Sequence, residues 1–255
     1  MIGEPFEHET VSAALRAFDC DTVINLAWRG VANHARNDYS KYDNIALADR
    51  WARAAADAGV AHYIGVGSQA EYGPTEGIVD ETMPLLPTTR YGVAKAAAGL
   101  ATRAALLGTN TAFSWVRIFS AYGPGDAPHW MIQAIGRSLL KDEPAEMTPG
   151  TQLWDYIYVD DVAEAFAAMA ATPAGLGYVN LGSGSTSTVR EIVELMKAAA
   201  ASQSDIVFGA VPFRPDQVMH LEADIGKLTS ITGWRPRVPL DRGLARTIDY
   251  LRENS

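Results

Sequence analysis

Hydrophobic positions along the chain alternate between helical spacing and short apolar runs. Apolar side chains recur every three or four residues over 9–19, and the apolar run 22–27 follows at once. This order predicts a helix and then a buried strand. The same pair recurs as a helix over 44–58, with Gly59 at the position of a C-terminal cap, and a strand over 62–68.

Two further pairs continue this alternation. The segment 91–107 has a helical pattern that stops at Gly108, and the apolar strand 112–118 follows. The last pair is a helix over 161–171 and a strand over 178–182. At the start of that helix, Asp161 and Glu164 have the spacing of a capping box.

Helices that alternate with fully apolar strands are typical of a parallel sheet, because each parallel strand needs a crossover and a helix supplies it. We therefore expect a doubly wound α/β fold. Beyond Gly182 the pattern changes to a helix capped by Thr188 and Glu191, followed by proline-rich segments. We expect a sheet domain formed by 1–122 and 155–182, and a smaller lobe formed by 123–154 and 183–255.

Composition narrows the possible functions. The 255 residues are 48% hydrophobic and carry a net charge of -9, which argues against nucleic acid as the main partner. The single cysteine, Cys20, allows no internal disulfide, and together with the acidic N-terminus and short apolar runs it favours a cytoplasmic protein without membrane spans. The spacing of His34, His62, His129 and His220 does not suggest a metal site.

The candidate chemistry lies in GSQAEYG at 67–73 and RYGVAK at 90–95. Tyr91 and Lys95 are four residues apart at the start of a predicted helix, so their side chains share one face. An ammonium group beside a phenol stabilises the phenolate and lowers the phenol pKa, which suits proton transfer. Ser68 ends a predicted strand and is expected at the same crevice, where its hydroxyl could hold a substrate oxygen.

These segments resemble the extended, or atypical, short-chain dehydrogenase/reductases of the NAD-dependent epimerase/dehydratase family. The resemblance covers essentially the whole chain. The matching segments are VINLA at 23–27, VGSQAEYG at 66–73, PTTRYGVAK at 87–95, VRIFSAYGPGD at 116–126, LWDYIYVDDVAEA at 153–165, YVNLGSGSTSTVREI at 178–192 and TGWRPRVPLDRGL at 232–244. The resemblance implies that the sheet domain is a Rossmann-like dinucleotide-binding domain and that the lobe binds substrate.

The resemblance also implies roles for individual residues. Ser68, Tyr91 and Lys95 would be the catalytic residues, and Tyr91 and Lys95 would also contact the NAD or NADP cofactor. The other cofactor-binding positions would be Ala27, Asn44 and Ile118. Substrate would be bound by Ser68, Gln69, Ser120 and Arg214, with the Arg214 guanidinium suited to a diphosphate. The helices that begin near Asn44 and Tyr91 would form a homodimer interface.

The glycine-rich turn that holds the cofactor pyrophosphate in this family is not found in the sequence. By comparison with the family, roughly the first 50 residues are expected to be missing before Met1. A fragment, a misplaced start codon and a genuine short form all remain open. We expect the chain as written to bind dinucleotide weakly or not at all.

The residues after Ser68 discriminate between reactions. Family dehydratases carry an Asp-Glu pair there, whereas this chain has Gln69 and Ala70, which disfavours dehydration. The combination of GSQAEYG, RIFSAYGP and LWDYIYVDD most closely resembles reductases that act on 4-keto-6-deoxy sugars attached to dTDP or CDP, and such a reductase is the first choice. The alternatives are a nucleotide-sugar 4-epimerase and a non-catalytic protein that senses dinucleotide. For Glu71 and Tyr72 we expect a role in shaping the loop above the site.

Overall fold

A parallel sheet of four strands organises the molecule. A computed structural model describes residues 7–30, 37–172, 174–213 and 217–254. The sheet has the strand order β1-β2-β4-β9, and all three pairings are parallel. Its strands are β1 (Thr22–Asn25), β2 (His62–Ser68), β4 (Ala112–Ile118) and β9 (Gly177–Leu181). The predicted parallel α/β sheet is confirmed, and it places the carboxyl ends of β2 and β4 side by side.

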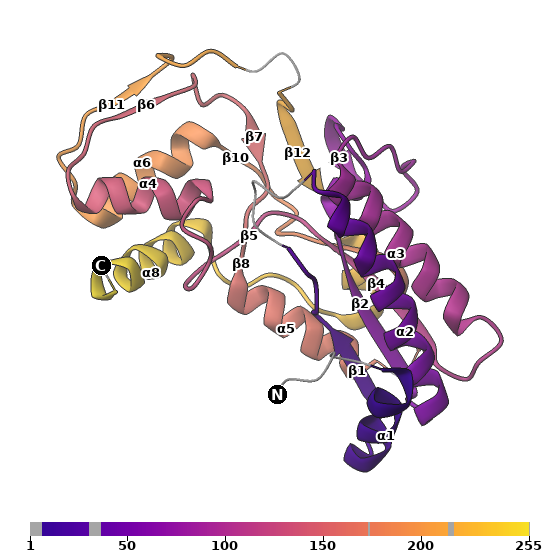
Figure 1. Cartoon of the computed structure of the whole chain (residues 1–255). Helices are drawn as coiled ribbons and strands as arrows, with labels where there is room; N and C mark the ends of the chain where they lie inside the picture. The colour runs from indigo at the N-terminus through magenta and orange to yellow at the C-terminus, as the bar shows by residue number, and fades with distance from the viewer. Residues whose placement is uncertain (1–6, 31–36, 173, 214–216, 255) are drawn as a thin grey trace.

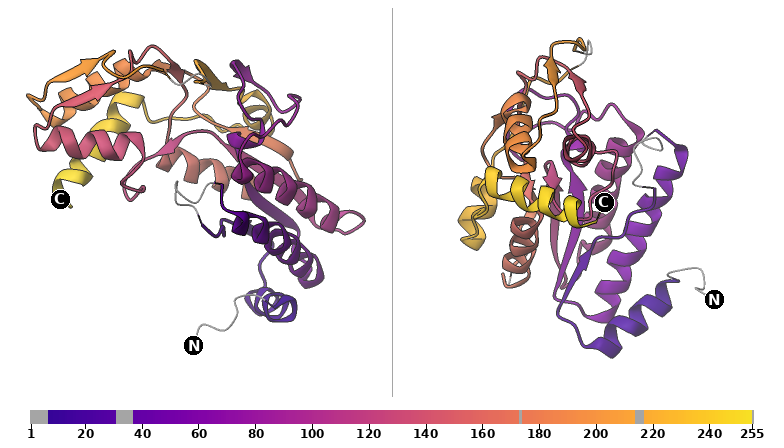
Figure 2. Two further views of the ribbon diagram at one scale, coloured as in Figure 1. Left: turned by 45° about the horizontal axis from the view of Figure 1, so that its top comes forward. Right: turned by 90° about the vertical axis from the view of Figure 1, so that its left-hand side faces the viewer.

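Helices cover both faces of this sheet (Figures 1 and 2). On one side lie α1 (His8–Phe18), α2 (Asp43–Ala58) and α3 (Arg90–Leu106). On the other side lies α5 (Val159–Ala170), with α7 (Gly226–Thr232) packed near β9. Several alanines of α2 and α3, among them Ala52, Ala55, Ala94 and Ala98, are fully buried, which allows these two helices to approach each other closely.

A second group of elements lies beyond the carboxyl ends of the parallel strands (Figure 1). It holds α4 (Met131–Leu140), α6 (Val189–Ala200) and α8 (Leu240–Glu253), which share a hydrophobic cluster with Tyr122 and Tyr158. A mixed sheet has the order β10-β7-β12-β3, with β10 (Ser187–Thr188), β7 (Leu153–Trp154), β12 (His220–Ala223) and β3 (Gly77–Val79).

Short elements complete the described chain. Two parallel pairs join β11 (Ile206–Phe208) to β6 (Ala145–Met147), and β5 (Ala121–Tyr122) to β8 (Ile157–Tyr158). Two 3-10 helices, η2 (Tyr39–Tyr42) and η3 (Gln69–Glu71), precede α2 and follow β2 respectively. None of the helices in the described part of the chain combines the length and apolar character needed to span a bilayer.

One sequence expectation needs correction, and two helices of the second group were not predicted. Asp161 does not cap α5, because the helix begins two residues earlier at Val159 and the Asp161 carboxylate instead accepts from the backbone N–H groups of Arg237 and Val238. The region 124–150 contains α4, and the proline-rich C-terminal segment leads into α8. These two helices were missed, although apolar residues of α8 such as Leu244, Ile248 and Leu251 have helical spacing.

Candidate active site

Ser68 is held at the point where β2 becomes η3. It is the N-cap residue of η3, and its Oγ accepts from the Ala70 backbone N–H at 3.2 Å. Its own backbone N–H donates to Oε1 of Glu71 at 3.0 Å, so the two residues form a complete capping box. Because one lone pair of the hydroxyl is used by Ala70, the hydroxyl hydrogen is directed away from that amide and can be donated to a ligand.

The start of α3 brings Tyr91 beside this turn. The Thr89 hydroxyl caps α3 by accepting from the Gly92 N–H at 3.1 Å. Tyr91 is the second residue of this helix. A Cβ atom on Gly92 would lie 2.3 Å from the Ala70 carbonyl oxygen. The close approach of α3 to η3 therefore requires glycine at this position, and it carries Tyr91 toward Ser68.

Lys95 lies one helical turn further along α3, and its side chain is 5% exposed. Its Nζ donates to the Val66 carbonyl on β2 at 2.8 Å and lies 5.9 Å from the centre of the Tyr91 ring. Lys95 and Gly92 of α3 therefore lie against β2 and the turn that follows Ser68, and the catalytic roles of Ser68, Tyr91 and Lys95 stay a prediction. Burial lowers the pKa of Lys95 to about 7, and the negative charge of Glu71 opposes this shift.

Trp28 completes the surroundings of this pair. Its ring centre lies 3.8 Å from the Lys95 Nζ, and its ring meets Tyr91 edge to face with the centres 5.9 Å apart. The indole therefore forms a cation–π contact with Lys95 while it orients the phenol ring. Sequence reasoning missed Trp28. Its only signal was an aromatic residue directly after the predicted strand 22–27.

The expected cofactor positions lie on three separate segments. Ala27 is exposed just after β1, and its N–H donates to the Asn25 side chain. Asn44, in the first turn of α2, is buried and bonds the backbone of Arg29 and Lys41. Its polar atoms therefore hold the segment after β1 in place, so a contribution of Asn44 to cofactor binding would act through that segment. Ile118 ends β4 directly opposite Ser68.

The expected substrate positions lie at the neighbouring strand ends. Ser120 follows β4, and its Oγ accepts from the indole N–H of Trp154 at 2.7 Å. Gln69 opens η3 half-buried, and its Oε1 has no hydrogen-bond partner among the described residues. Arg214 lies outside the described residues. Trp154 was also missed by sequence reasoning, because it comes from β7, 34 positions from Ser120.

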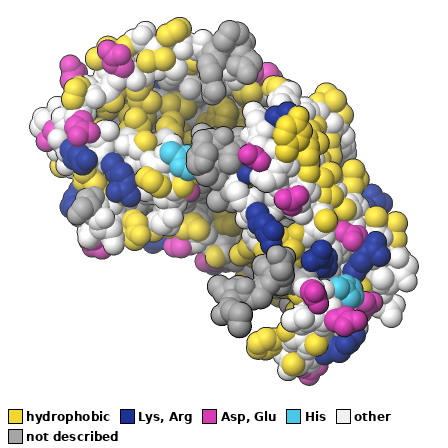
Figure 3. Space-filling model, in the orientation of Figure 1, with side chains coloured by type: hydrophobic (Ala, Val, Ile, Leu, Met, Phe, Trp, Pro, Cys, Tyr) yellow, Lys and Arg dark blue, Asp and Glu magenta, His cyan; other side chains and the backbone are white. Residues whose placement is uncertain are grey.

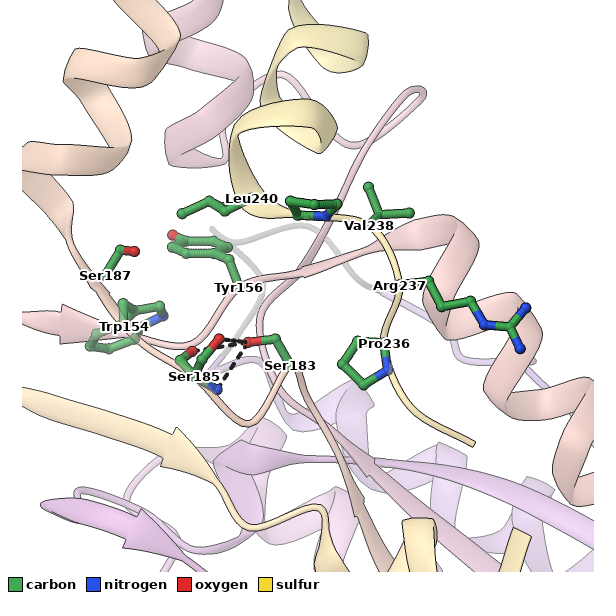
Figure 4. A pocket seen from close by; sticks show the side chains of 10 residues that line it. Trp154, Tyr156, Ser183, Ser185, Ser187, Pro236, Arg237, Val238 and Leu240 are labelled. Atoms are coloured by element: carbon green, nitrogen blue, oxygen red, sulfur yellow. Dashed lines mark hydrogen bonds between the residues drawn. The ribbon is translucent and has the colours of Figure 1, made fainter. Parts of the chain in front are cut away.

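Trp154 also forms one wall of a small pocket of about 250 Å³ (Figure 4). Figure 4 shows Tyr156 and Leu240 on one side of this pocket and Ser183 and Ser185 on the other. The Ser183 Oγ is bonded to the buried carboxylate of Asp155 at 2.7 Å. The indole therefore lies between this pocket and Ser120.

The surface carries charges of both signs. On the face shown in Figure 3, basic and acidic side chains are interspersed, and no single sign dominates it. Among the residues that the structure describes, no group of three or more His, Cys, Asp or Glu side chains is placed to hold a metal ion.

A sheet with helices on both faces, and a Ser-Tyr-Lys group beyond its strand ends, defines the short-chain dehydrogenase type of protein. Residues 3–182 match the model of the NAD dependent epimerase/dehydratase family, and the chain belongs to this family.

Relatives with known names are nucleotide-sugar enzymes. The chain is 28% identical to the UDP-glucose 4-epimerase of Mycolicibacterium smegmatis over 96% of this chain and 80% of that protein. It is 31% identical to the dTDP-L-rhamnose 4-epimerase of Burkholderia thailandensis over 65% of this chain and 46% of that protein. With several curated relatives, including the latter, the chain thus aligns over less than half of the relative's length.

A solved structure extends the likeness to the fold. The UDP-glucose 4-epimerase of Thermus thermophilus, in complex with NAD, superposes with a TM-score of 0.82 at 25% identity. The match covers 98% of this chain and 83% of that one. The membership of the epimerase/dehydratase family inferred from the sequence is confirmed by the family match.

Proposed function

We propose that this chain is an NAD(P)-dependent oxidoreductase that reduces a 4-keto-6-deoxy sugar attached to a nucleoside diphosphate. The observation that supports a nicotinamide-dependent reaction is the placement of Ser68, Tyr91 and Lys95 near the carboxyl end of β2, with the Lys95 Nζ buried beside the phenol ring. The choice of reduction rests on the resemblance of GSQAEYG, RIFSAYGP and LWDYIYVDD to 4-ketoreductases. The family match supports a nicotinamide-dependent reaction, and the nucleotide-sugar relatives support a nucleotide-sugar substrate.

In this proposal the nicotinamide cofactor, when bound, supplies the hydride for the keto carbon. Ser68 donates a hydrogen bond from its hydroxyl to the carbonyl oxygen and so holds this oxygen in place. Tyr91 then donates its phenolic proton to the same oxygen as negative charge develops there. Lys95 stabilises the phenolate that remains, since a cation beside a phenol favours its ionised form.

The residues present fit a nicotinamide cofactor at this edge of the sheet. Lys95 presents a buried ammonium group with donors to spare beyond its bond to Val66, and Trp28 and Ile118 offer apolar surface nearby. We propose that Lys95, Ala27 and Ile118 line the cofactor site, and that Asn44 shapes it through the backbone of Arg29. NAD and NADP both remain candidates.

A 4-epimerase is the second candidate function. The names of the relatives in M. smegmatis and B. thailandensis favour it. An epimerase would use the same three residues, but it would oxidise its substrate and then reduce it again with the same cofactor molecule. Dehydration is disfavoured here, because the residues after Ser68 are Gln69 and Ala70 rather than an acidic pair.

Cofactor stoichiometry separates the two candidates. With NADH or NADPH at millimolar concentration and a dTDP-linked 4-keto-6-deoxy sugar, a reductase consumes one cofactor per product. An epimerase instead interconverts UDP-glucose and UDP-galactose with no net consumption of cofactor. We expect stoichiometric consumption, and epimerisation without it would overturn the reductase assignment.

The variant Tyr91→Phe tests the mechanism in either case. It keeps the ring that contacts Trp28 and removes only the phenolic hydroxyl group, so we expect activity to fall by about a hundredfold or more. Equal activity in both proteins would refute the proposed proton transfer. If neither protein turns over any nucleotide sugar but both bind dinucleotide, the non-catalytic alternative is supported instead.

A homodimer formed through α2 and α3 remains a prediction. Val93 and Leu100 of α3 are exposed apolar side chains on this part of the molecule. Sedimentation of the chain, compared with that of a Leu100→Glu variant, tests this: a dimer that dissociates in the variant supports the prediction, and a monomeric wild-type protein contradicts it.

A further inference from the structure

Glu71, three residues after Ser68, carries a carboxylate that is enclosed by the protein. The Glu71 side chain is fully buried, and its two oxygens accept three hydrogen bonds. Oε1 accepts from the Ser68 backbone N–H at 3.0 Å and from the Trp115 indole N–H at 2.9 Å, and Oε2 accepts from Nε of Arg117 at 2.9 Å. A carboxylate so enclosed has no direct path to a substrate, so it cannot act as an acid or base there.

Arg117 connects this carboxylate to a wider buried network. Its guanidinium, also nearly fully buried, donates to the Tyr72 hydroxyl at 2.9 Å. That hydroxyl in turn donates to Oδ1 of Asn180 on β9 at 2.7 Å. The Arg117 guanidinium also lies over the rings of Tyr72 and Tyr178. Burial raises the pKa of Tyr72, so this phenol stays protonated and donates its hydrogen bond.

Two glycines of β2, Gly65 and Gly67, leave room for this network because they carry no side chain. A Cβ atom on Gly67 would lie 2.3 Å from Oε1 of Glu71 and 2.4 Å from Nε1 of Trp115. A Cβ on Gly65 would lie 2.5 Å from the Trp115 ring. The two glycines therefore form a slot in which the indole and the carboxylate lie close against the strand that ends at Ser68.

Stability alone does not account for this arrangement. A buried ion pair loses the hydration of both charges, and an apolar pair of similar volume often stabilises a protein as well or better. The distinctive feature of this pair is where it acts. One of its oxygens bonds directly to the backbone of the residue that presents the candidate catalytic hydroxyl.

We propose that Glu71 is a positioning residue for Ser68: its carboxylate, held by Arg117 and Trp115, fixes the Ser68 backbone so that the hydroxyl stays directed to the substrate oxygen. This inference rests on the proposed function. Catalytic hydroxyls need placement within a fraction of an ångström, and a shift of about 1 Å can cost about a hundredfold in rate.

A matched pair of double variants tests this role. Both carry Arg117→Met, so neither leaves an unpaired buried charge. Glu71→Gln/Arg117→Met keeps an oxygen that can accept from Ser68, whereas Glu71→Leu/Arg117→Met has a side chain of similar size with no acceptor. A role in packing alone would make the two variants behave alike.

The first measurement is hydrogen exchange of the Ser68 amide by NMR, which needs no turnover. We expect this amide to be protected in the wild-type protein and in the glutamine variant, and to exchange at least about tenfold faster in the leucine variant. Equal exchange in both variants, or rapid exchange in the wild-type protein, would overturn the proposal. Exchange of the Ser68 amide in the wild-type protein tests the proposal even if the leucine variant does not fold.

The second measurement is steady-state kinetics. We expect the leucine variant to have a kcat about tenfold to a hundredfold below that of the glutamine variant, with a similar KM. In a Ser68→Ala background this difference should vanish, because Glu71 acts through Ser68; a difference that persists contradicts this pathway. If the wild-type protein shows no turnover, the proposed function fails, while amide exchange still decides whether Glu71 fixes Ser68.

Discussion

The Lys95 ammonium group lies 3.8 Å from the centre of the Trp28 ring, although the two residues come from segments on opposite sides of α2 in the sequence. The same indole meets the edge of Tyr91. Trp28 also packs against the cluster of Ala48, Ala98 and Trp115. A residue from the segment after β1 thus covers Lys95 and Tyr91 of α3.

The buried amine should make the free energy of unfolding depend on pH. Lys95 has a pKa of about 7 in the folded protein and an ordinary value of 10.5 in the unfolded chain. Between these values the unfolded chain binds more protons, so stability rises as pH increases from 7 toward 10.5 and is lost as pH falls through 7. We expect Lys95 to contribute a rise on the order of a few kcal/mol.

Denaturant unfolding of the wild-type protein and of Lys95→Met at several pH values measures this contribution. Methionine keeps most of the side-chain volume and does not titrate, so the difference between the two curves isolates Lys95. The wild-type protein should gain stability relative to the variant as pH rises. Parallel curves between pH 7 and 10 would contradict the buried state of this amine.

Removal of Trp28 should raise the pKa of Lys95. Desolvation is the larger cause of its depressed value, and Trp28→Ala would admit water to the Nζ. The lost cation–π contact acts in the opposite direction but is worth less. We expect a rise of roughly one unit or more in Trp28→Ala and a smaller one in Trp28→Phe, measured by NMR titration of the Lys95 side chain. An unchanged pKa in Trp28→Ala would mean that other groups keep water away.

The pattern of the sequence was sufficient for those parts of the fold that depend on local signals. Strands β2 and β4 have the predicted bounds, since each is a short apolar run enclosed by polar turns. Helix α3 was placed within one residue, and its internal spacing brought Tyr91 and Lys95 together correctly. The start of α5 was misplaced, because Asp161 serves a loop 76 positions away rather than its own helix.

The rest of the site depends on contacts between distant segments. Trp28 reaches Lys95, and Trp154 reaches Ser120, only after the sheet and the second group of elements have assembled. No spacing rule within one helix or strand predicts such pairs. Likewise, Glu71 follows Ser68 closely in the sequence, but its partner Arg117 lies on β4, 46 positions away.

The bond from Trp154 to Ser120 should contribute to substrate binding. An indole N–H can only donate, so Ser120 accepts from it and its hydroxyl hydrogen stays available for a substrate oxygen. We expect Trp154→Phe and Ser120→Ala each to weaken nucleotide-sugar affinity about tenfold, with little further loss in the double variant. Trp234→Phe is the control, because its buried N–H has no partner among the described residues. Additive losses would contradict the coupling.

Gly67 should be sensitive to the smallest added side chain. In Gly67→Ala the new methyl group would collide with the Glu71 carboxylate and the Trp115 indole, and neither can move without breaking buried hydrogen bonds. We expect a loss of about 1–3 kcal/mol in the free energy of unfolding, measured by denaturant titration. Gly226→Ala is the matched control: at the first position of α7 only the Asp224 side chain lies nearby, and alanine favours helix. Equal stability of the two variants would show that the slot along β2 tolerates a methyl group.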